Sequence, residues 1–191
     1  MTKASRGKIF DPLPRNMDRK AFQQKFGGVY EHFPAIAQNA WARGLTAETD
    51  TPTGLAAAMA AVAASMPDSS KLTLICNHPD LAEKTAIGGL TAASRGEQAG
   101  AGLDQCSPGE YRRFQELNDA YKEKFGFPFI LAVGGKTRRE IFAVFEGRID
   151  NDRDTEFRTA LQQIDRIAVL RLEKLAGAEA TSPRPFPRAR P

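Results

Sequence analysis

The sequence predicts an all-α fold, a single-domain bundle of about eight helices, and three observations support this class. Apolar side chains recur every three or four residues through most of the 191-residue chain, as on the buried face of a helix. Capping residues and glycines mark the two ends of several of these segments. Only one short apolar run, residues 129–133, resembles a β-strand, and a single strand cannot form a sheet.

The two ends of the chain differ from this helical body. Residues 1–17 contain two prolines and show no hydrophobic period, so we expect an irregular N-terminal segment. Residues 177–191 contain four prolines together with several arginines, a composition typical of a disordered tail. The helical domain is therefore expected over residues 18–176, which is long enough to bury one hydrophobic core.

Start and stop signals place the helices of the first half. Asp18 is a favoured N-cap residue and Gly27 a favoured C-terminal residue, while Pro34 suits the first turn of a helix. We expect helices over residues 18–27 and 34–44, from residue 52 onward, and over residues 79–89, with residues 71–76 either helical or extended.

Two capping boxes open helices in the second half. Ser107 with Glu110, and Thr137 with Glu140, each pair a hydroxyl with a carboxylate three residues later. The last helix is expected over residues 154–177, where positions spaced three and four residues apart are mostly apolar.

An arginine interrupts the apolar face of this last helix. The stripe contains, in order, Phe157, Leu161, Ile164, Ala168, Arg171 and Leu175. Because helical residues advance by about 100°, Arg171 falls near the middle of the face. A guanidinium there costs free energy unless it is paired or meets a ligand. The stripe alone favours a structural ion pair, and the alternative is a clamp for a carboxylate.

His78 is one of only two histidines and lies between Asn77 and Pro79. Pro79 favours an extended conformation at His78, which would place the imidazole ring at the N-terminus of the expected helix over residues 79–89. A side chain on such a loop can meet a ligand, although a buried histidine can equally be structural. The residues by themselves leave both interpretations open.

The two cysteines, Cys76 and Cys106, predict neither a disulfide framework nor a metal site. Cys76 and His78 form a Cys-x-His pair that lacks the further ligands of a zinc ion. Cys76 ends an apolar run and is therefore expected in the core. A hydrolase with Cys76 as nucleophile and His78 as base remains an alternative.

Ser94, Glu97 and Gln98 form a compact polar motif. Ser94 and Glu97 have the spacing of another capping box, which is the structural interpretation. If the segment is instead helical throughout, the spacing of three and four residues places all three side chains on one face. Such a face can bind a polar heterocycle through several hydrogen bonds.

The formal charge of +4 does not predict nucleic-acid binding. Residues 1–10 contribute +3 and residues 178–191 contribute +2, which leaves the rest of the chain at −1. No run of 18 or more apolar residues exists, so no transmembrane helix is expected. The N-terminus lacks the apolar core of a secretory signal, and we expect a cytoplasmic protein.

Four segments, together with Arg171, carry a resemblance to a known family. They read Asn-His-Pro-Asp-Leu at 77–81, Ser-Arg-Gly-Glu-Gln at 94–98, Ala-Gly-Leu-Asp at 101–104 and Phe-Gly-Phe-Pro-Phe-Ile at 125–130. In this order they resemble the OHCU decarboxylases, and the upstream segment Tyr-Glu-His-Phe-Pro at 30–34 also fits. These enzymes decarboxylate 2-oxo-4-hydroxy-4-carboxy-5-ureidoimidazoline (OHCU) to (S)-allantoin after urate oxidation.

The resemblance implies an all-α homodimer that acts on this small molecule without a cofactor or metal. It also implies that His78 is the catalytic acid/base and that Glu97 and Arg171 are catalytic polar residues of the same pocket. The substrate-binding residues that it implies are Pro79, Ser94, Arg95, Gly96, Glu97, Gln98, Phe129, Ile130, Leu131, Ala132 and Val133.

From these residues we expect a division of roles. Arg171 would orient an anionic or carbonyl oxygen of the ligand, and Glu97 with Gln98 would hold its N–H groups. His78 would take the hydroxyl proton or deliver a proton to one face. The alternative from another functional class is a non-catalytic helical protein that binds a ureide in the same pocket.

Overall fold

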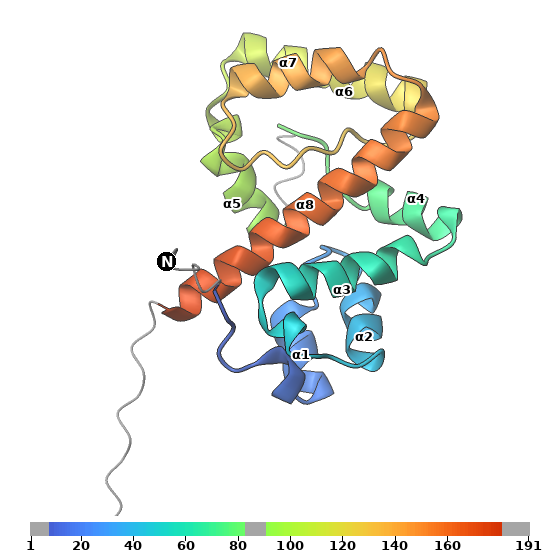
Figure 1. Ribbon diagram of the computed structural model, residues 1–191. Coiled ribbons are helices and arrows are strands. Elements are labelled where there is room, and N and C mark those ends of the chain that lie inside the picture. Colours follow the sequence, from blue (N-terminus) through green and yellow to red (C-terminus); the bar gives the residue numbers. More distant parts are fainter. Residues whose placement is uncertain (1–7, 83–90, 181–191) are drawn as a thin grey trace, which may run out of the picture.

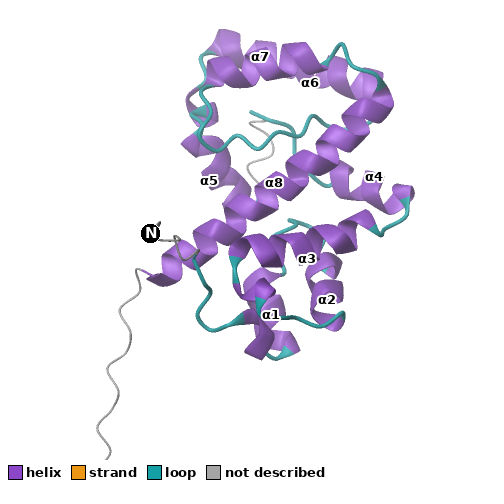
Figure 2. Cartoon of the chain, in the orientation of Figure 1, coloured by secondary structure: helices purple, strands orange, loops and turns teal. Residues whose placement is uncertain are grey.

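The computed structural model describes residues 8–82 and 91–180, and in these residues it contains eight α-helices and no strand. The predicted all-α class is therefore confirmed (Figure 2). The helices are α1 (Arg19–Phe26), α2 (Ala35–Ala42), α3 (Pro52–Ala64), α4 (Asp68–Cys76), α5 (Ala92–Gly100), α6 (Pro108–Phe125), α7 (Arg138–Arg148) and α8 (Arg153–Ala180). Short 3-10 helices span Pro14–Asn16, Glu48–Asp50 and Leu103–Gln105.

The 28-residue helix α8 is the axis of the fold. Figure 1 shows it running between two groups of helices, with α1, α2 and α3 on one side and α5, α6 and α7 on the other. It contacts α3, α4 and α6. Side chains that lie far apart in the sequence therefore meet along this helix.

The predicted capping residues set the helix ends. The Asp18 carboxylate accepts the backbone N–H of Ala21 at 2.8 Å, which satisfies a free donor of the first turn of α1. Both predicted capping boxes form, at the starts of α6 and α7. Helix α6 ends at Gly126, whose φ of 79° belongs to the left-handed region that glycine adopts without strain.

An extended segment, residues 127–133, connects α6 to α7 through the core. Its side chains from Phe129 to Val133 are buried, and the Phe129 ring stacks on that of Phe145 with centroids 3.7 Å apart. No strand pairs with this segment among the described residues. A side chain takes the place of a backbone hydrogen-bond partner in a sheet, since the N–H of Ala132 donates to Gln163 on α8 at 3.1 Å.

The expected helix over residues 79–89 is wrong where the structure describes it. Residues 79 and 80 are irregular, residues 81 and 82 form a turn, and residues 83–90 lie outside the described part of the chain. The N–H of Ala82 donates to Gln98 at 3.1 Å, and the carbonyl of Leu81 accepts from Asn118 at 2.9 Å. These tertiary contacts engage backbone groups that a helix would pair internally. Residues 71–76, by contrast, are helical and belong to α4.

Parts of the two end segments, residues 8–17 and 177–180, are described by the structure. Phe10 is 1% exposed and its N–H donates to the carbonyl of Asp50 at 2.9 Å, so part of the irregular N-terminal segment packs on the domain. Helix α8 continues through Ala180, past its expected end at residue 177, and the remaining tail residues, 181–191, lie outside the described range. None of the described helices is long and apolar enough to span a bilayer.

Candidate active site

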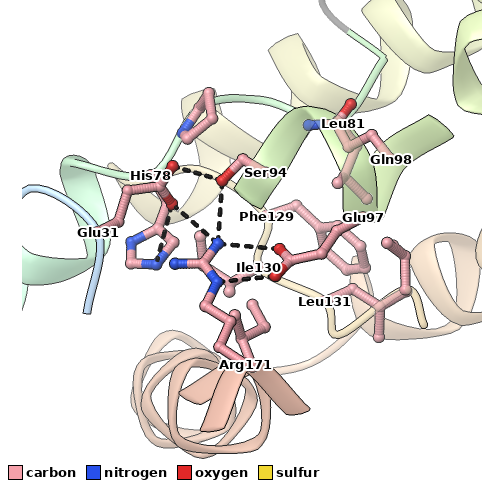
Figure 3. Close-up of a pocket in the computed structure, with 13 residues that line it drawn as sticks. Glu31, His78, Leu81, Ser94, Glu97, Gln98, Phe129, Ile130, Leu131 and Arg171 are labelled. Carbon is pink, nitrogen blue, oxygen red and sulfur yellow. Dashed lines mark hydrogen bonds and ion pairs between the residues drawn. The ribbon is translucent and has the colours of Figure 1, made fainter. Parts of the chain in front are cut away.

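A pocket opens between the turn after α4, helices α5 and α8, and the extended segment (Figure 3). One part of its lining is polar and the other part is a wall of apolar side chains. The residues that line it are Glu31, His78, Pro79, Leu81, Ser94, Glu97, Gln98, Phe129, Ile130, Leu131, Val133, Ile167 and Arg171. Five of them, Glu31, His78, Ser94, Glu97 and Arg171, interact with one another and are called the pocket cluster below.

His78 lies at the C-terminal end of α4, and the expected position at a helix N-terminus is wrong. Its Nδ1 lies 2.9 Å from the carbonyl oxygen of Leu74 in the last turn of α4. Because a carbonyl can only accept, Nδ1 carries a proton and the neutral ring presents the lone pair of Nε2. The side chain is 6% exposed, so this lone pair is held in a nearly dry site.

Arg171 is buried and uses every nitrogen of its guanidinium on the protein. Nε and Nη2 donate to the two oxygens of Glu97 at 2.7 and 2.9 Å, a bidentate pair. Nη1 donates to the carbonyl of Val29 at 3.2 Å, and Nη2 also reaches Ser94 at 3.0 Å. The arginine that interrupts the apolar stripe is therefore a paired residue at the pocket wall, as Figure 3 shows.

A second carboxylate, that of Glu31, lies on the other side of the same guanidinium. Its Oε1 accepts hydrogen bonds from the hydroxyls of Ser94 and Thr91. Its Oε2 lies 3.4 Å from Nη2 of Arg171 and 3.9 Å from Nε2 of His78. The pocket cluster thus contains two carboxylates and one guanidinium, with the imidazole as the remaining titratable group.

The charge balance of the cluster is reflected in its pKa values. Burial lowers the pKa of His78 below its usual value, although the Leu74 carbonyl and the carboxylates of Glu31 and Glu97 act in the opposite direction. Burial also acts to raise the pKa of Glu31, but hydrogen bonds from Ser94 and the charge of Arg171 outweigh it and hold that pKa low. The site at rest therefore combines a neutral imidazole with an ionised carboxylate.

Helix α5 supplies the polar motif as a continuous helical face. Thr91, not Ser94, is the N-cap residue, so the alternative in which the segment is helical throughout is the one observed. The Oε1 of Gln98 accepts the N–H of Ala82, which leaves the amide NH₂ of Gln98 as the group available to a ligand. No group of three or more His, Cys, Asp or Glu side chains suited to a metal ion occurs in residues 8–82 and 91–180.

The sequence profile of the OHCU decarboxylase family matches residues 15–173. The chain belongs to the OHCU decarboxylase family. A relative from Halalkalicoccus jeotgali, 2-oxo-4-hydroxy-4-carboxy-5-ureidoimidazoline decarboxylase, is 42% identical over 83% of this chain and 86% of its own length. The family resemblance, and with it the decarboxylase class of enzyme, is therefore confirmed.

Solved structures are also similar to this chain. A crystal structure of (S)-allantoin synthase is 30% identical, with a TM-score of 0.65 over 85% of this chain and about half, 52%, of the other. A crystal structure of an OHCU decarboxylase in the presence of (S)-allantoin superposes with a TM-score of 0.59 over 75% of this chain and 91% of the other. At 22% identity this second structure supports the fold alone.

The structure brings most of the predicted OHCU decarboxylase site residues together. His78, Glu97 and Arg171 all line the pocket, and so do Pro79, Ser94, Gln98, Phe129, Ile130, Leu131 and Val133. Three predicted substrate-binding residues do not line it. Arg95 and Gly96 are exposed residues of α5, and Ala132 is buried behind the wall, where its N–H bonds to Gln163.

Three pocket residues were missed by sequence reasoning. Leu81 belongs to the family segment 77–81 but was not predicted as a site residue, and Ile167 is an apolar residue that no motif distinguishes from the core. Glu31 lies in the segment 30–34 of the family resemblance, which was the available signal, but its burial and its φ of 39° depend on tertiary structure.

Cys76 is exposed on α4, and its expected place in the core is wrong. It does not line the pocket, although His78 is only two residues away. Partial burial raises the pKa of its thiol, which disfavours the thiolate that a nucleophilic cysteine needs. The structure therefore gives no support to a hydrolase built on Cys76 and His78.

Proposed function

We propose that this chain decarboxylates 2-oxo-4-hydroxy-4-carboxy-5-ureidoimidazoline to (S)-allantoin in urate degradation, with His78 as the acid/base. The family match over residues 15–173 supports the reaction. The observation that carries the role of His78 is its fixed ring, whose Nδ1 faces a carbonyl while Nε2 faces the pocket and Glu31.

The named substrate has its carboxylate and hydroxyl on one ring carbon, C4, beside the ureido-bearing carbon C5. In the tautomer with a C5=N bond, loss of CO₂ from C4 leaves an electron pair that forms a C4=C5 bond. The C=N electrons pass to the ring nitrogen, which takes up a proton. Since the substrate accepts these electrons itself, the route that we propose uses no separate electron sink.

The protein's task is then to orient the ring and control two protons. In our proposal Nε2 of His78 accepts the C4 hydroxyl proton, and a proton is returned to one face of C5 to set the (S) configuration. The apolar wall of Pro79, Phe129 and Ile130 keeps water from competing for that proton. The C-terminal end of α4 favours the imidazolium that forms in between.

The remaining polar residues divide into ligand contacts and supports. We propose that the NH₂ of Gln98 donates to a carbonyl oxygen of the substrate, since its oxygen is already held by Ala82. The free side of the Glu97 carboxylate, 28% exposed, is available to a ureido or ring N–H group. Arg171 is better supported as the residue that orients Glu97 than as a direct clamp for the substrate carboxylate, because each of its three nitrogens already donates to the protein.

His78→Asn tests the proposed role in this reaction. The substrate is generated freshly by urate oxidation, and its ultraviolet absorbance is followed with wild-type protein and with the variant. A positioned acid/base is worth about 10²–10⁴-fold, so kcat of the variant should fall by that factor. An unchanged rate in a folded variant would contradict the assignment.

The alternative from another class, a ureide-binding protein without chemistry, makes a different prediction. It requires saturable binding of (S)-allantoin and no acceleration of substrate decay by the wild-type chain. Calorimetric titration with (S)-allantoin, run beside the turnover assay, separates the two. The family match favours the enzyme.

We further propose, on the family resemblance, that the chain acts as a homodimer in the cytoplasm. Light scattering of the full chain after size exclusion should give about twice the 20.9 kDa chain mass. A mass of one chain at assay concentration would refute the dimer, and recovery of the native protein outside the cytoplasmic fraction would refute the compartment.

A further inference from the structure

Glu31 is the one charged member of the pocket cluster to which the proposed chemistry gives no task. It lies in the turn between α1 and α2 with a φ of 39°, a backbone conformation that costs a non-glycine residue free energy. Its side chain is 1% exposed. A strained, buried and charged residue beside an active-site histidine requires a physical explanation.

Structural pairing alone does not explain Glu31. Arg171 already has a bidentate partner in Glu97, at 2.7 and 2.9 Å, whereas its distance to Glu31 is 3.4 Å. Two carboxylates therefore share one guanidinium, and the pocket cluster carries one negative charge in excess while His78 is neutral. A buried excess charge is costly unless a further positive charge forms there.

His78 is placed to provide that positive charge. Oε2 of Glu31 and Nε2 of His78 are 3.9 Å apart, too far for a hydrogen bond and close enough for an ion pair once Nε2 is protonated. Thr91 and Ser94 fix Oε1 of the same carboxylate, so that Oε2 remains directed at the ring (Figure 3). The carboxylate is thus preorganised for a charge that appears only during the reaction.

We propose that Glu31 is a positioning residue that stabilises the imidazolium of His78 after Nε2 has accepted the substrate proton, an inference that rests on the proposed function. The pocket cluster then passes from one excess negative charge to neutrality at the step where His78 acts as base. No bond to the substrate is required of Glu31, which acts through His78.

The other charged groups around the ring set the size of this effect. Arg171 on α8 opposes protonation of His78, whereas Glu97 on α5 and the Leu74 carbonyl on α4 favour it along with Glu31. Burial lowers the pKa of His78 and is the largest influence. Removing the Glu31 charge while keeping the side-chain size should therefore lower this pKa further and make His78 a weaker base.

Glu31→Gln tests the proposal with a readout that does not depend on turnover. The chain has two histidines, and the imidazole signals of His78 in an NMR titration are assigned by their absence from His78→Asn. We expect the His78 midpoint to move to lower pH in the variant. We also expect kcat to fall about 10- to 100-fold with little change in KM.

Tyr30→Phe is the matched control. It removes a buried hydroxyl from the residue next to Glu31, whose 2.6 Å hydrogen bond goes to Asp165 on α8, and leaves the pocket charges unchanged. The control should leave the His78 midpoint in place. Glu31→Asp keeps the negative charge but places it farther from the His78 ring. The His78 midpoint and kcat of this variant should lie between those of wild type and Glu31→Gln.

A folded Glu31→Gln protein with the wild-type His78 midpoint would overturn the proposal. If Glu31→Gln does not fold, Glu31→Asp decides, and an unchanged His78 midpoint and kcat in that variant would overturn it instead. Failure of the proposed function looks different, because His78→Asn would then retain activity while the midpoint in Glu31→Gln could still move.

Discussion

Residues 8–82 and 91–180 include a buried arginine–carboxylate cluster at the pocket and another in the core. The core cluster consists of Tyr121, Arg148, Asn151 and Glu156. Arg148 donates to Oε2 of Glu156 from Nε at 2.9 Å and from Nη2 at 2.7 Å, and Asn151 donates to Oε1 at 2.7 Å. Tyr121 donates its hydroxyl to the same carboxylate.

The two clusters differ in charge balance and in access. The core cluster has one cation and one anion, and the Glu156 side chain is 0% exposed. The pocket cluster has two carboxylates for one guanidinium, a neutral imidazole, and a Glu97 side chain that is 28% exposed. A balanced, closed network holds structure, whereas an unbalanced and accessible one is prepared to accept a proton and a ligand.

The core cluster nevertheless supports the pocket. Nη1 of Arg148 donates to the carbonyl of Ile130 at 2.7 Å, and its guanidinium lies 4.4 Å from the centroid of the Phe129 ring. Both residues belong to the extended segment that forms the pocket wall. Since this segment has no sheet partners, the core cluster is a main reason that the wall keeps its position.

Glu156→Gln should give the largest effect on stability. Breaking a buried ion pair leaves Arg148 uncompensated, which costs about 3–5 kcal/mol of unfolding free energy. Urea denaturation measures the loss. The exposed Glu116→Gln, which touches only a surface ion pair, should change stability by less than about 0.5 kcal/mol. Equal losses in the two variants would refute the structural role of the core cluster.

The same change in the pocket, Glu97→Gln, should reduce activity more than stability. Because Glu97 is partly exposed, the stability loss should be smaller than for Glu156→Gln. Loss of the charged hydrogen bonds to Arg171 and of a contact to substrate should lower kcat/KM by about 10- to 100-fold. Steady-state kinetics and urea denaturation on one preparation test both parts. A variant that is less stable than Glu156→Gln but fully active would reverse the assignment of the two clusters.

The two clusters should also respond to acid in different pH windows. Burial lowers the pKa of His78, so the unfolded chain binds its proton first as pH falls below about 6.5, and stability is lost from there down to the native value. Burial acts to raise the pKa of Glu156, but hydrogen bonds from Arg148 and Asn151 hold it low, and its contribution is lost only below about 4.3. In His78→Asn the loss of stability in the upper pH window should be absent, whereas the loss in the lower window should remain. Persistence of the upper window in the variant would show that another group titrates there.

Cys76→Ala should give the smallest effect. Cys76 is exposed and lies outside both clusters, so kcat and KM should stay within about twofold of wild type. Alkylation of the native protein with iodoacetamide should likewise leave turnover intact. Loss of activity in the alanine variant would show that the Cys76 thiol takes part in the reaction.

The fold could be predicted from the sequence where local chemistry decides it. The capping pairs at Ser107 and Thr137 open their helices as expected, because a cap is made within one turn. The turn after His78 could not be predicted, since Gln98 and Asn118 hold its backbone from other helices. The sequence predicts an extended conformation for residues 129–133, but nothing local indicates that side chains, and not neighbouring strands, bond to the backbone of this segment.

The site could be predicted only in part, for a related reason. Arg171 stands out because a charge on an apolar stripe is visible in the sequence, and the family resemblance identified His78 and Glu97. Glu31 lies in the family segment 30–34, but the segment alone does not mark it as a pocket residue, because its partner on α8 is 140 residues away and its backbone conformation is imposed by the packing around it. The charge balance of the pocket, on which the chemistry depends, exists only once the chain is folded.

The optical purity of the allantoin formed tests the central role of His78 most directly. Fresh substrate is converted in D₂O by wild-type protein and by His78→Asn, and the product is analysed by circular dichroism and NMR. The wild type should give only (S)-allantoin with one deuterium on the carbon that bears the ureido group, and the variant only slow formation of racemic product. Optically pure (S)-allantoin formed by His78→Asn at the wild-type rate would contradict the account.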